Sequence, residues 1–247
     1  MDDDRICGAN AVAALFARRP DDARRLFYTE PMRQVAGPFC SRLARAHLPY
    51  RMMPADEIAR VAGTPHHGGI CAVAAPRAIP ALEPSAPPKL ALMLALDGIG
   101  NPHNLGAIAR SAAFFGVGAL LLHERAGAAM PSDAAYRVAE GGLEHLDLYR
   151  TDDLAGAVRA LQPWYRSVAA TLAPQAAMPG ELPSDRPTLL VLGHEEEGVS
   201  PAVLAACRRQ VRVAARGPVQ SLNVAQAAAV LLYALGRESI GPRGAGP

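Results

Sequence analysis

The sequence predicts an α/β protein in which a small α/β domain precedes a parallel sheet with helices. Three observations support this prediction. Residues 76–88 read PRAIPALEPSAPP, and the five prolines there disfavour both helix and sheet. Short β-like and helical segments mix before this stretch, and apolar runs alternate with helical patterns after it. We therefore expect a semi-rigid linker between two domains.

The segment before the linker carries the pattern of the smaller domain. Helical periodicity occurs twice, in Val12, Leu15 and Phe16 and then in Leu43, Ala46 and His47. Short β-like pieces lie between and after these helices, at 26–29, 50–53 and 70–73. This alternation predicts a small α/β sandwich.

The segment after the linker carries the pattern of a parallel sheet of about five or six strands. Strands buried on both faces are apolar throughout, and such runs occur at 90–96, 118–122, 166–172, 188–193 and 210–215. Helical patterns separate them at 104–115, 152–162, 201–209 and 221–236. The predicted division is an accessory domain at 1–75, the linker at 76–88, the sheet domain at 89–240 and a disordered tail at 241–247.

Composition limits the function classes. Of 247 residues, 50% are hydrophobic and 19% are charged, which excludes wholesale disorder. The formal net charge is +2, so the chain does not bind nucleic acid by bulk charge. Lys89 is the only lysine, and the arginines that supply the other positive charges suit local phosphate contacts.

Cysteine spacing and the N-terminus indicate a reduced, cytoplasmic protein. The four cysteines, Cys7, Cys40, Cys71 and Cys207, form no CxxC pair, and no histidine pair has zinc spacing. We therefore expect no metal. The adjacent histidines at 66–67 could bind one, but without further ligands the favoured interpretation is an ordinary loop. The acidic start at 2–4 is unlike a secretory signal, and no apolar run approaches the roughly 20 residues of a membrane helix. We expect no membrane contact.

The first unusual loop, DGIGNPHN at 97–104, follows a predicted strand. It resembles a phosphate cradle but lacks the GxGxxG fingerprint and the P-loop lysine, which disfavours an ordinary dinucleotide site and a Rossmann oxidoreductase. Asn104 is predicted to cap the next helix. Arg110 falls outside the apolar stripe of that helix, so it is either a solvated arginine or a phosphate or substrate contact.

The second unusual loop, GHEEEGVS at 193–200, brackets an acidic tripeptide with two glycines. The glycines permit a close approach of the backbone, and at least one carboxylate must lie near the strand end, where ligands bind in open parallel sheets. Ordinary helix-entry chemistry explains Ser200 and Pro201 but leaves the two glycines unexplained.

The third loop, GPVQSLNV at 217–224, leads into an alanine-rich helix. Ser221 is predicted to cap this helix, with Asn223 in its first turn. The many alanines of the helix indicate that another backbone packs closely against it, as in a crowded subunit contact.

The order and spacing of the three motifs resemble the SpoU (TrmH-like) family of RNA ribose 2′-O-methyltransferases. The motifs are LDGIGNPHNLGAIARSA at 96–112, LVLGHEEEGVS at 190–200 and GPVQSLNV at 217–224. The N-terminal segment is similar to the accessory domain of that family, a fold akin to an RNA-binding ribosomal protein. This looser match rests on ICGANAV at 6–12 and HHGGI at 66–70.

The resemblance implies a trefoil-knotted methyltransferase domain of the SPOUT type, with S-adenosylmethionine as methyl donor and rRNA or tRNA as substrate. It also implies a homodimer with the site near the subunit interface. By motif position, the backbone that contacts the cofactor lies at Gly193, Val213, Leu222 and, as a weaker candidate, Thr171. The functional side chains implied by the motifs are those of Asn104, Arg110, Glu195, Ser221 and Asn223.

In the family, an arginine at the position of Arg110 is proposed to assist deprotonation of the ribose hydroxyl. A guanidinium stays protonated at ordinary pH, so we favour a bidentate clamp on phosphate that stabilises the developing alkoxide. The acceptor of the proton stays open. The other four side chains are expected to orient Arg110, the ribose and the cofactor loops.

Several positions depart from the family pattern. In the second motif the chain has His194, Glu196 and Glu197 where small or basic residues are usual, and in the third motif Ala214 replaces a proline. Carboxylates near RNA phosphate are repulsive, so either these side chains point away or the substrate differs. The alternative function is an RNA-binding protein that keeps the fold without turnover.

A further arginine cluster is a candidate RNA contact or a solvated face: Arg18, Arg19, Arg24 and Arg25.

Overall fold

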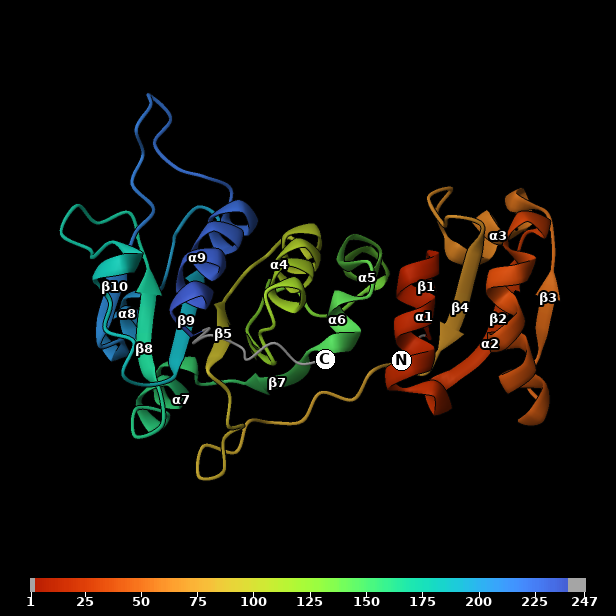
Figure 1. Cartoon of the computed structure of the whole chain (residues 1–247), viewed down its shortest axis with the longest axis horizontal. Helices are drawn as coiled ribbons and strands as arrows, with labels where there is room; N and C mark the ends of the chain where they lie inside the picture. The colour runs from red at the N-terminus through yellow and green to blue at the C-terminus, as the bar shows by residue number, and fades with distance from the viewer. Residues whose placement is uncertain (1–2, 240–247) are drawn as a thin grey trace, which may run out of the picture.

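The computed structural model describes residues 3–239, and within them two sheets stand side by side along the long axis of the molecule (Figure 1). The strands of the N-terminal sheet are β1 (Asp4–Cys7), β2 (Ala23–Tyr28), β3 (Tyr50–Met52) and β4 (Ile70–Ala74). Its helices are α1 (Ala9–Arg18), α2 (Arg33–Arg45) and α3 (Ala55–Ala62), with 3₁₀ turns η1 (Pro20–Asp22) and η2 (Glu30–Met32). The strand order is β1-β4-β2-β3, and only the β2–β3 pair is parallel.

The small α/β sandwich predicted for the N-terminal segment is confirmed. The three predicted strands correspond to β2, β3 and β4, and the two predicted helices to α1 and α2. The second helix ends at Arg45, so the prediction was wrong for Ala46 and His47, which follow it, and His47 has a left-handed φ of 56°. Strand β1 and helix α3 were not predicted. β1 has only two apolar residues, Ile6 and Cys7, too few for an alternation to show. Helix α3 does carry a helical period in Ile58, Val61 and Ala62, and the prediction missed it.

The C-terminal sheet has six parallel strands in the order β10-β8-β9-β5-β6-β7. The strands are β5 (Leu92–Asp97), β6 (Ala119–His123), β7 (Asp147–Thr151), β8 (Arg166–Ala170), β9 (Thr188–Gly193) and β10 (Arg209–Val211). The helices are α4 (Pro102–Phe114), α5 (Asp133–Ala139), α6 (Gly142–His145), α7 (Leu154–Ala160), α8 (Pro201–Ala206) and α9 (Val224–Ser239), with the 3₁₀ turn η3 (Pro179–Glu181). The parallel α/β sheet is confirmed, whereas the trefoil knot stays a prediction.

The five predicted strands of this sheet correspond to β5, β6, β8, β9 and β10, and the four predicted helices to α4, α7, α8 and α9. The prediction was wrong for 212–215, because β10 ends at Val211, and for 207–209, because α8 ends at Ala206. Strand β7 was not predicted because it is an edge strand in which only Leu148 is buried, so it carries no apolar run. Helices α5 and α6 were not predicted either; α6 has only four residues, too few for a period to show. The predicted tail at 241–247 lies outside the described residues.

Alternate residues of the strands face two separate layers of helices. On one face, Leu94, Leu120 and Leu190 belong to a core that also includes residues of α4, α5 and α9. On the other face, Met93 and Val191 pack in a core with residues of α7 and α8. Burial on both faces explains why these strands are apolar throughout.

The proline-rich stretch at 76–88 contains no helix or regular strand and lies along the edge of the second sheet. The Leu82 amide donates to the Arg150 carbonyl at 2.9 Å, and the Arg150 amide donates to the Pro80 carbonyl at 3.0 Å. These bonds cover part of the open edge of β7, which would otherwise present unpaired backbone groups. The connection between the two sheets is therefore held in place at its centre.

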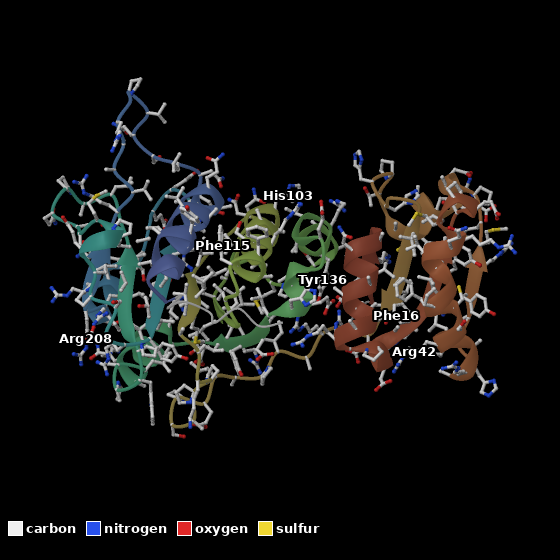
Figure 2. All side chains as sticks on the ribbon, viewed as in Figure 1. Phe16, Arg42, His103, Phe115, Tyr136 and Arg208 are labelled. Carbon is white, nitrogen blue, oxygen red and sulfur yellow. The ribbon has the colours of Figure 1, made fainter. Side chains whose placement is uncertain are left out.

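A buried ion pair joins the two halves of the molecule. Arg19, at the end of α1, donates through Nε and Nη2 to the two carboxylate oxygens of Glu144 on α6, at 2.8 and 3.0 Å. The Glu144 side chain is 1% exposed and that of Arg19 is 12% exposed. Figure 2 shows Tyr136 of α5 at this junction, and Arg19 donates to its hydroxyl at 3.3 Å. Burial opposes the charge of Arg19, but the contact with Glu144 outweighs it and raises the pKa.

The arginine cluster at 18–25 does not form one exposed face. Arg19 is committed to the junction, and the Arg18 Nε donates to the Glu144 carbonyl at 3.4 Å. Arg24 pairs with Asp3 at the surface. The prediction of a shared RNA-contact face is therefore wrong for Arg19, because a buried carboxylate on the other domain binds its guanidinium.

We predict that Arg19→Ala lowers the free energy of unfolding by about 3 kcal/mol, because it removes both hydrogen bonds to the buried Glu144 carboxylate and leaves that group only the longer 3.7 Å ion pair with Arg77. The measurement is a urea titration followed by circular dichroism. Arg60→Ala is the control, since Arg60 pairs with Asp56 at the surface, where both side chains are more than two thirds exposed. That substitution should cost less than about 0.5 kcal/mol. Equal effects of the two substitutions would contradict a stabilising role for the junction pair.

Candidate functional site

The site is built where β5 and β9 end side by side. The two strands pair in register from Leu92 with Thr188 to Asp97 with Gly193, so their loops leave the sheet together. The buried carboxylate of Asp97 lies 3.0 Å from His123 Nδ1 and accepts from the Ser200 amide at 2.7 Å. Burial would raise the pKa of Asp97, but the Ser200 and His123 contacts outweigh it and the pKa is lowered. Asp97 thus ties three strand-end loops together.

The second motif closes on itself directly after β9. The His194 amide donates to the Gly198 carbonyl at 2.9 Å, and the Gly198 amide donates to the His194 carbonyl at 2.9 Å. A Cβ on Gly193 would lie 2.0 Å from the Gly198 carbonyl carbon, so only glycine fits there. The predicted close approach of the backbone is confirmed, and its partner is the loop itself.

Glu195 projects from this loop onto the first motif. Its carboxylate accepts from the Gly100 amide at 3.2 Å, the Asn101 amide at 3.3 Å and Asn104 Nδ2 at 2.7 Å. Partial burial would raise the pKa of Glu195, but the Asn104 hydrogen bond and the backbone amides outweigh it and lower the pKa. The predicted carboxylate at the strand end is therefore present and holds the first loop.

The predicted helix caps are wrong at both Asn104 and Ser221. Helix α4 begins at Pro102, and its cap is Asn101, whose side chain accepts from the His103 amide at 2.8 Å. Proline fits the first helical position because its φ is already helical, so the helix starts earlier than the apolar stripe suggests. Helix α9 begins at Val224, and Asn223 Oδ1 accepts from the Ala225 amide at 2.8 Å.

Asn104 is therefore free to connect the three motifs. It donates to Glu195 of the second motif, and its Oδ1 accepts from Asn223 Nδ2 of the third motif at 3.1 Å. The structure thus brings three of the five predicted side chains into one hydrogen-bonded chain. Ser221 lies two residues before Asn223, is exposed and makes no hydrogen bond within the described residues.

Arg110 lies on the same helix as Asn104, about 9 Å further along its axis at 1.5 Å per residue. Its Nη1 donates to the Glu140 carboxylate at 2.9 Å, and the two side chains are 57% and 47% exposed. Glu140 follows α5 in a left-handed conformation with φ 45°. Arg110 does not contact the Glu195–Asn104–Asn223 chain.

Glu140 is the neighbour of Arg110 that the sequence prediction missed. A Cβ on Gly142 would lie 2.7 Å from the Arg110 Cα, so α6 packs directly on the backbone of α4 there. The signal in the sequence is an acidic residue followed by two glycines at 140–142, similar to the glycine-bracketed acids of the second motif. This signal points to Arg110 only once α6 is known to pack on α4, and the sequence alone does not predict that contact.

The four predicted cofactor contacts lie around the same edge of the sheet but are less closely joined. Thr171 follows β8, and its amide donates to the Val211 carbonyl at 2.9 Å. Val213 and Leu222 lie in the segment between β10 and α9, which projects from the body (Figure 1). In the described part of the chain, residues 213–222 make no hydrogen bond to the remainder.

These residues fit a cofactor held mainly by main-chain groups. Amides and carbonyls at 213–222 are available as donors and acceptors, and the Leu222 side chain is 47% exposed and apolar, which suits a purine ring. Gly193 is the last residue of β9, which β8 separates from β10. No charged side chain is needed there for this fit.

The extra acids of the second motif point towards solvent or arginine. The Glu197 carboxylate is 74% exposed and lies 3.8 Å from Arg125. His194 Nδ1 accepts from the Glu196 amide at 3.2 Å, which stabilises the loop.

Between residues 3 and 239, no group of three or more His, Cys, Asp or Glu side chains is arranged to hold a metal ion. Nor does any helix in that range have the length and apolar character to cross a membrane.

Two family models match the chain. The model described as the SpoU rRNA Methylase family matches residues 91–233. The model described as RNA 2′-O ribose methyltransferase substrate binding matches residues 5–80.

Relatives agree with these matches. An Escherichia coli O157:H7 protein, named uncharacterized tRNA/rRNA methyltransferase YfiF, is 30% identical over 92% of this chain and 66% of its own length. The 23S rRNA (guanosine-2′-O-)-methyltransferase RlmB of Acinetobacter baylyi is 30% identical over 93% of this chain and 91% of its own length. This chain spans 45% of a further relative from Haemophilus influenzae.

A solved structure shares the fold. The AdoMet-bound rRNA methyltransferase from Sinorhizobium meliloti has a TM-score of 0.79, with 97% of this chain and 89% of that chain covered and 21% identity. The strand order, the three joined motifs and the family matches lead to one conclusion: the chain belongs to the SpoU rRNA methylase family, which its motifs resemble.

Proposed function

We propose that this chain transfers the methyl group of S-adenosylmethionine to a ribose 2′-hydroxyl of structured RNA, either rRNA or tRNA. The observation that carries the proposal is the Glu195–Asn104–Asn223 chain, which joins the three family motifs at the carboxyl edge of the sheet. Ligands bind at this edge in open parallel sheets. The helix that supplies Asn104 also carries Arg110, so the site and the candidate catalytic arginine share one rigid element.

The cofactor side of the site consists of main-chain groups. We assign its binding to the backbone of Gly193, Val213 and Leu222, with Thr171 as a further candidate. Gly193 and Thr171 lie at the carboxyl ends of β9 and β8, and the backbone at 213–222 makes no hydrogen bond to the remainder of the described chain. When bound, S-adenosylmethionine supplies an electrophilic methyl group. The task of the protein is then to align the hydroxyl and to stabilise the negative charge that develops on it.

Arg110 is assigned the second task. An exposed guanidinium can bind a phosphate through two parallel hydrogen bonds and place positive charge near the ribose oxygen. The Glu140 carboxylate, 2.9 Å away, limits the orientations of this guanidinium before RNA binds. Ser221 and Asn223 lie just before α9, beside the site, and are assigned to orienting the ribose and the cofactor segment.

The two halves of the chain are assigned different roles. We propose that residues 1–75 bind RNA and that residues 89–240 carry the reaction, with 76–88 as the linker. The family matches at 5–80 and 91–233 support this division. The four unpaired cysteines suit a reducing compartment, and we place the protein in the cytoplasm.

We further propose a homodimer. Large apolar side chains are exposed on α4 and α9, with Phe114 82%, Val230 43% and Tyr233 54% accessible. Phe115 connects the two helices, because its ring packs edge-on against Phe114 and lies 6.1 Å from the Tyr233 ring. A contiguous apolar surface of this kind marks an association site, and it lies on the two helices that carry the motifs.

The second candidate function is RNA binding without turnover. The observation that favours it is the acidic loop, because Glu196 and Glu197 are exposed beside the site and would repel RNA phosphate. The arrangement of the three motifs favours the enzyme.

We predict that Arg110→Ala lowers methyl incorporation from labelled S-adenosylmethionine into total RNA by about 100-fold, the loss expected when one stabilising donor is removed. Arg150→Ala is the matched control, because Arg150 also pairs at the surface, with Glu124 at 2.6 Å. It should retain activity within about twofold.

The same assay tests the other assignments. Glu140→Gln should lower kcat by several-fold, leave KM unchanged and cause no further loss in an Arg110→Ala background, as expected of a positioning residue. If folded wild-type protein incorporates no methyl group into either rRNA or tRNA, the RNA-binding alternative replaces the enzyme.

The lowered pKa of Glu195 predicts a pH dependence. A carboxylate whose pKa is depressed in the folded state contributes stability above its ordinary value, 4.5, and loses that contribution as the pH falls through the folded value. The stability difference between wild type and Glu195→Gln should therefore be constant from about pH 7 to pH 5 and shrink below 4.5. Glu196→Gln, in the same loop, is the control and should show no such change. Urea titrations across this range make the measurement.

The dimer proposal predicts that wild-type protein sediments at twice the chain mass of 25.9 kDa. Phe114→Asp should give a monomer, because it buries a charge in the apolar contact. Val35→Asp places the same charge on α2, where Val35 is 42% exposed, and should leave the dimer intact. Sedimentation velocity distinguishes these outcomes, and a monomeric wild type would exclude the dimer.

A further inference from the structure

An open cavity of about 810 Å³ lies at one end of the N-terminal sheet. Three segments form it: η2 with the residue before it, the end of β3 with the start of α3, and the turn that leads into β4. It lies in the first half of the chain, whereas the Glu195–Asn104–Asn223 chain belongs to the second sheet. No step assigned above uses it.

A buried histidine supplies the polar group of this cavity. His67 lines the cavity and is 5% exposed. Its Nδ1 accepts from the Gly69 amide at 3.1 Å, so the neutral ring carries its hydrogen on Nε2. No residue from 3 to 239 pairs with Nε2, and this atom is not sealed from solvent. A buried side chain thus presents one unused donor to an accessible cavity.

The position of His67 is fixed by a tight turn. The Ile70 amide donates to the His67 carbonyl at 3.3 Å, and the two central residues, Gly68 and Gly69, have φ of +61° and +77°. Positive φ at both central positions is typical of a type I′ turn, and glycine adopts this conformation without steric strain. The Thr29 amide donates to the Gly69 carbonyl at 2.8 Å, which ties the turn to β2. The Nε2 donor is therefore held in one place.

The other walls of the cavity determine the chemistry of its ligand. They are mainly apolar, and the residues that form them include Pro31, Met52, Met53, Pro54 and Pro65. No lysine or arginine lines the cavity. Glu30 is one of the lining residues, and its carboxylate lies 3.4 Å from Arg33 Nη1 in an ion pair at the surface. This lining disfavours a phosphate and favours a flat, uncharged ring with hydrogen-bonding atoms on its edge.

We propose that this cavity binds one unpaired nucleobase of the RNA substrate. The base stacks on the methionine and proline walls, an edge acceptor receives the His67 Nε2 hydrogen, and Glu30 accepts from an exocyclic or ring N–H. Proteins recognise RNA sequence chiefly at such unstacked bases, by stacking and edge hydrogen bonds. The inference rests on the proposed RNA-binding role of residues 1–75 and adds the part of the RNA that is recognised.

The test uses full-length protein and five RNA hairpins of one stem sequence. Four carry a single unpaired A, C, G or U, and the fifth is fully paired. Wild type should bind at least one bulged hairpin about 10-fold more tightly than the paired stem, since stacking of one base on the cavity walls strengthens binding by about that factor. Fluorescence anisotropy at several salt concentrations measures these affinities.

Two substitutions address the cavity. His67→Asn keeps an acceptor for the Gly69 amide but removes the ring and its Nε2 donor, and Met52→Glu places a charge on a wall residue that is 47% exposed. Both should abolish most of the 10-fold preference and leave binding of the paired stem and its salt slope unchanged, because no phosphate contact is lost. Val35→Glu is the control, since it adds the same charge to an exposed residue outside the cavity.

The outcomes are distinguishable. A wild type that binds all five hairpins equally, or variants that keep the preference for the bulged hairpin, would overturn the nucleobase proposal alone. A fall in paired-stem affinity as large as the fall for the bulged hairpin would also overturn it, since the cavity would then contact the helix and not a base. A wild type that binds no hairpin would overturn the RNA-binding role of residues 1–75 as well.

Discussion

The register between β5 and β9 is the constraint on which the site depends. Because Asp97 pairs with Gly193 at the last position of both strands, the first and second motifs leave the sheet at the same level. Glu195 can then reach the Gly100 and Asn101 amides, and Asn104 can reach Asn223. A shift of one residue would turn the strand side chains to the opposite faces and separate the motifs. The buried Asp97 carboxylate secures this register at its end through His123 and Ser200.

Much of the fold could be predicted because its strands are apolar on both faces and its longer helices have a clear period. The predictions failed where a segment was short or at an edge, as in β1, α6 and β7. The two wrong helix caps have a common cause. Asn104 and Ser221 are good capping residues by type, but Pro102 and Asn223 begin the helices at other positions. Local propensity could not decide between neighbouring residues that are all suitable.

The site was predictable where it depended on motif order and not where it depended on packing between distant segments. The positions of Glu195, Asn104 and Asn223 follow from strand ends that share one edge. The ion pair of Arg110 with Glu140 does not follow, since it arises from α6 packing on α4 through Gly142. The commitment of Arg19 to Glu144 is another contact across the chain, and nothing in the run of arginines at 18–25 distinguishes this one from the others.

Helix α6 contacts both halves of the molecule within four residues. Glu144 binds Arg19 of the N-terminal half, and Gly142 lies against the backbone of Arg110. A rigid connector this short leaves little room for one half to rotate against the other. In the proposed division of roles, where residues 1–75 bind the RNA, the recognised feature and the methylated ribose must therefore lie a fixed distance apart. Selection among RNAs that share the same recognised feature would accordingly depend on their three-dimensional folding, because only a correctly folded RNA has its target ribose at that distance.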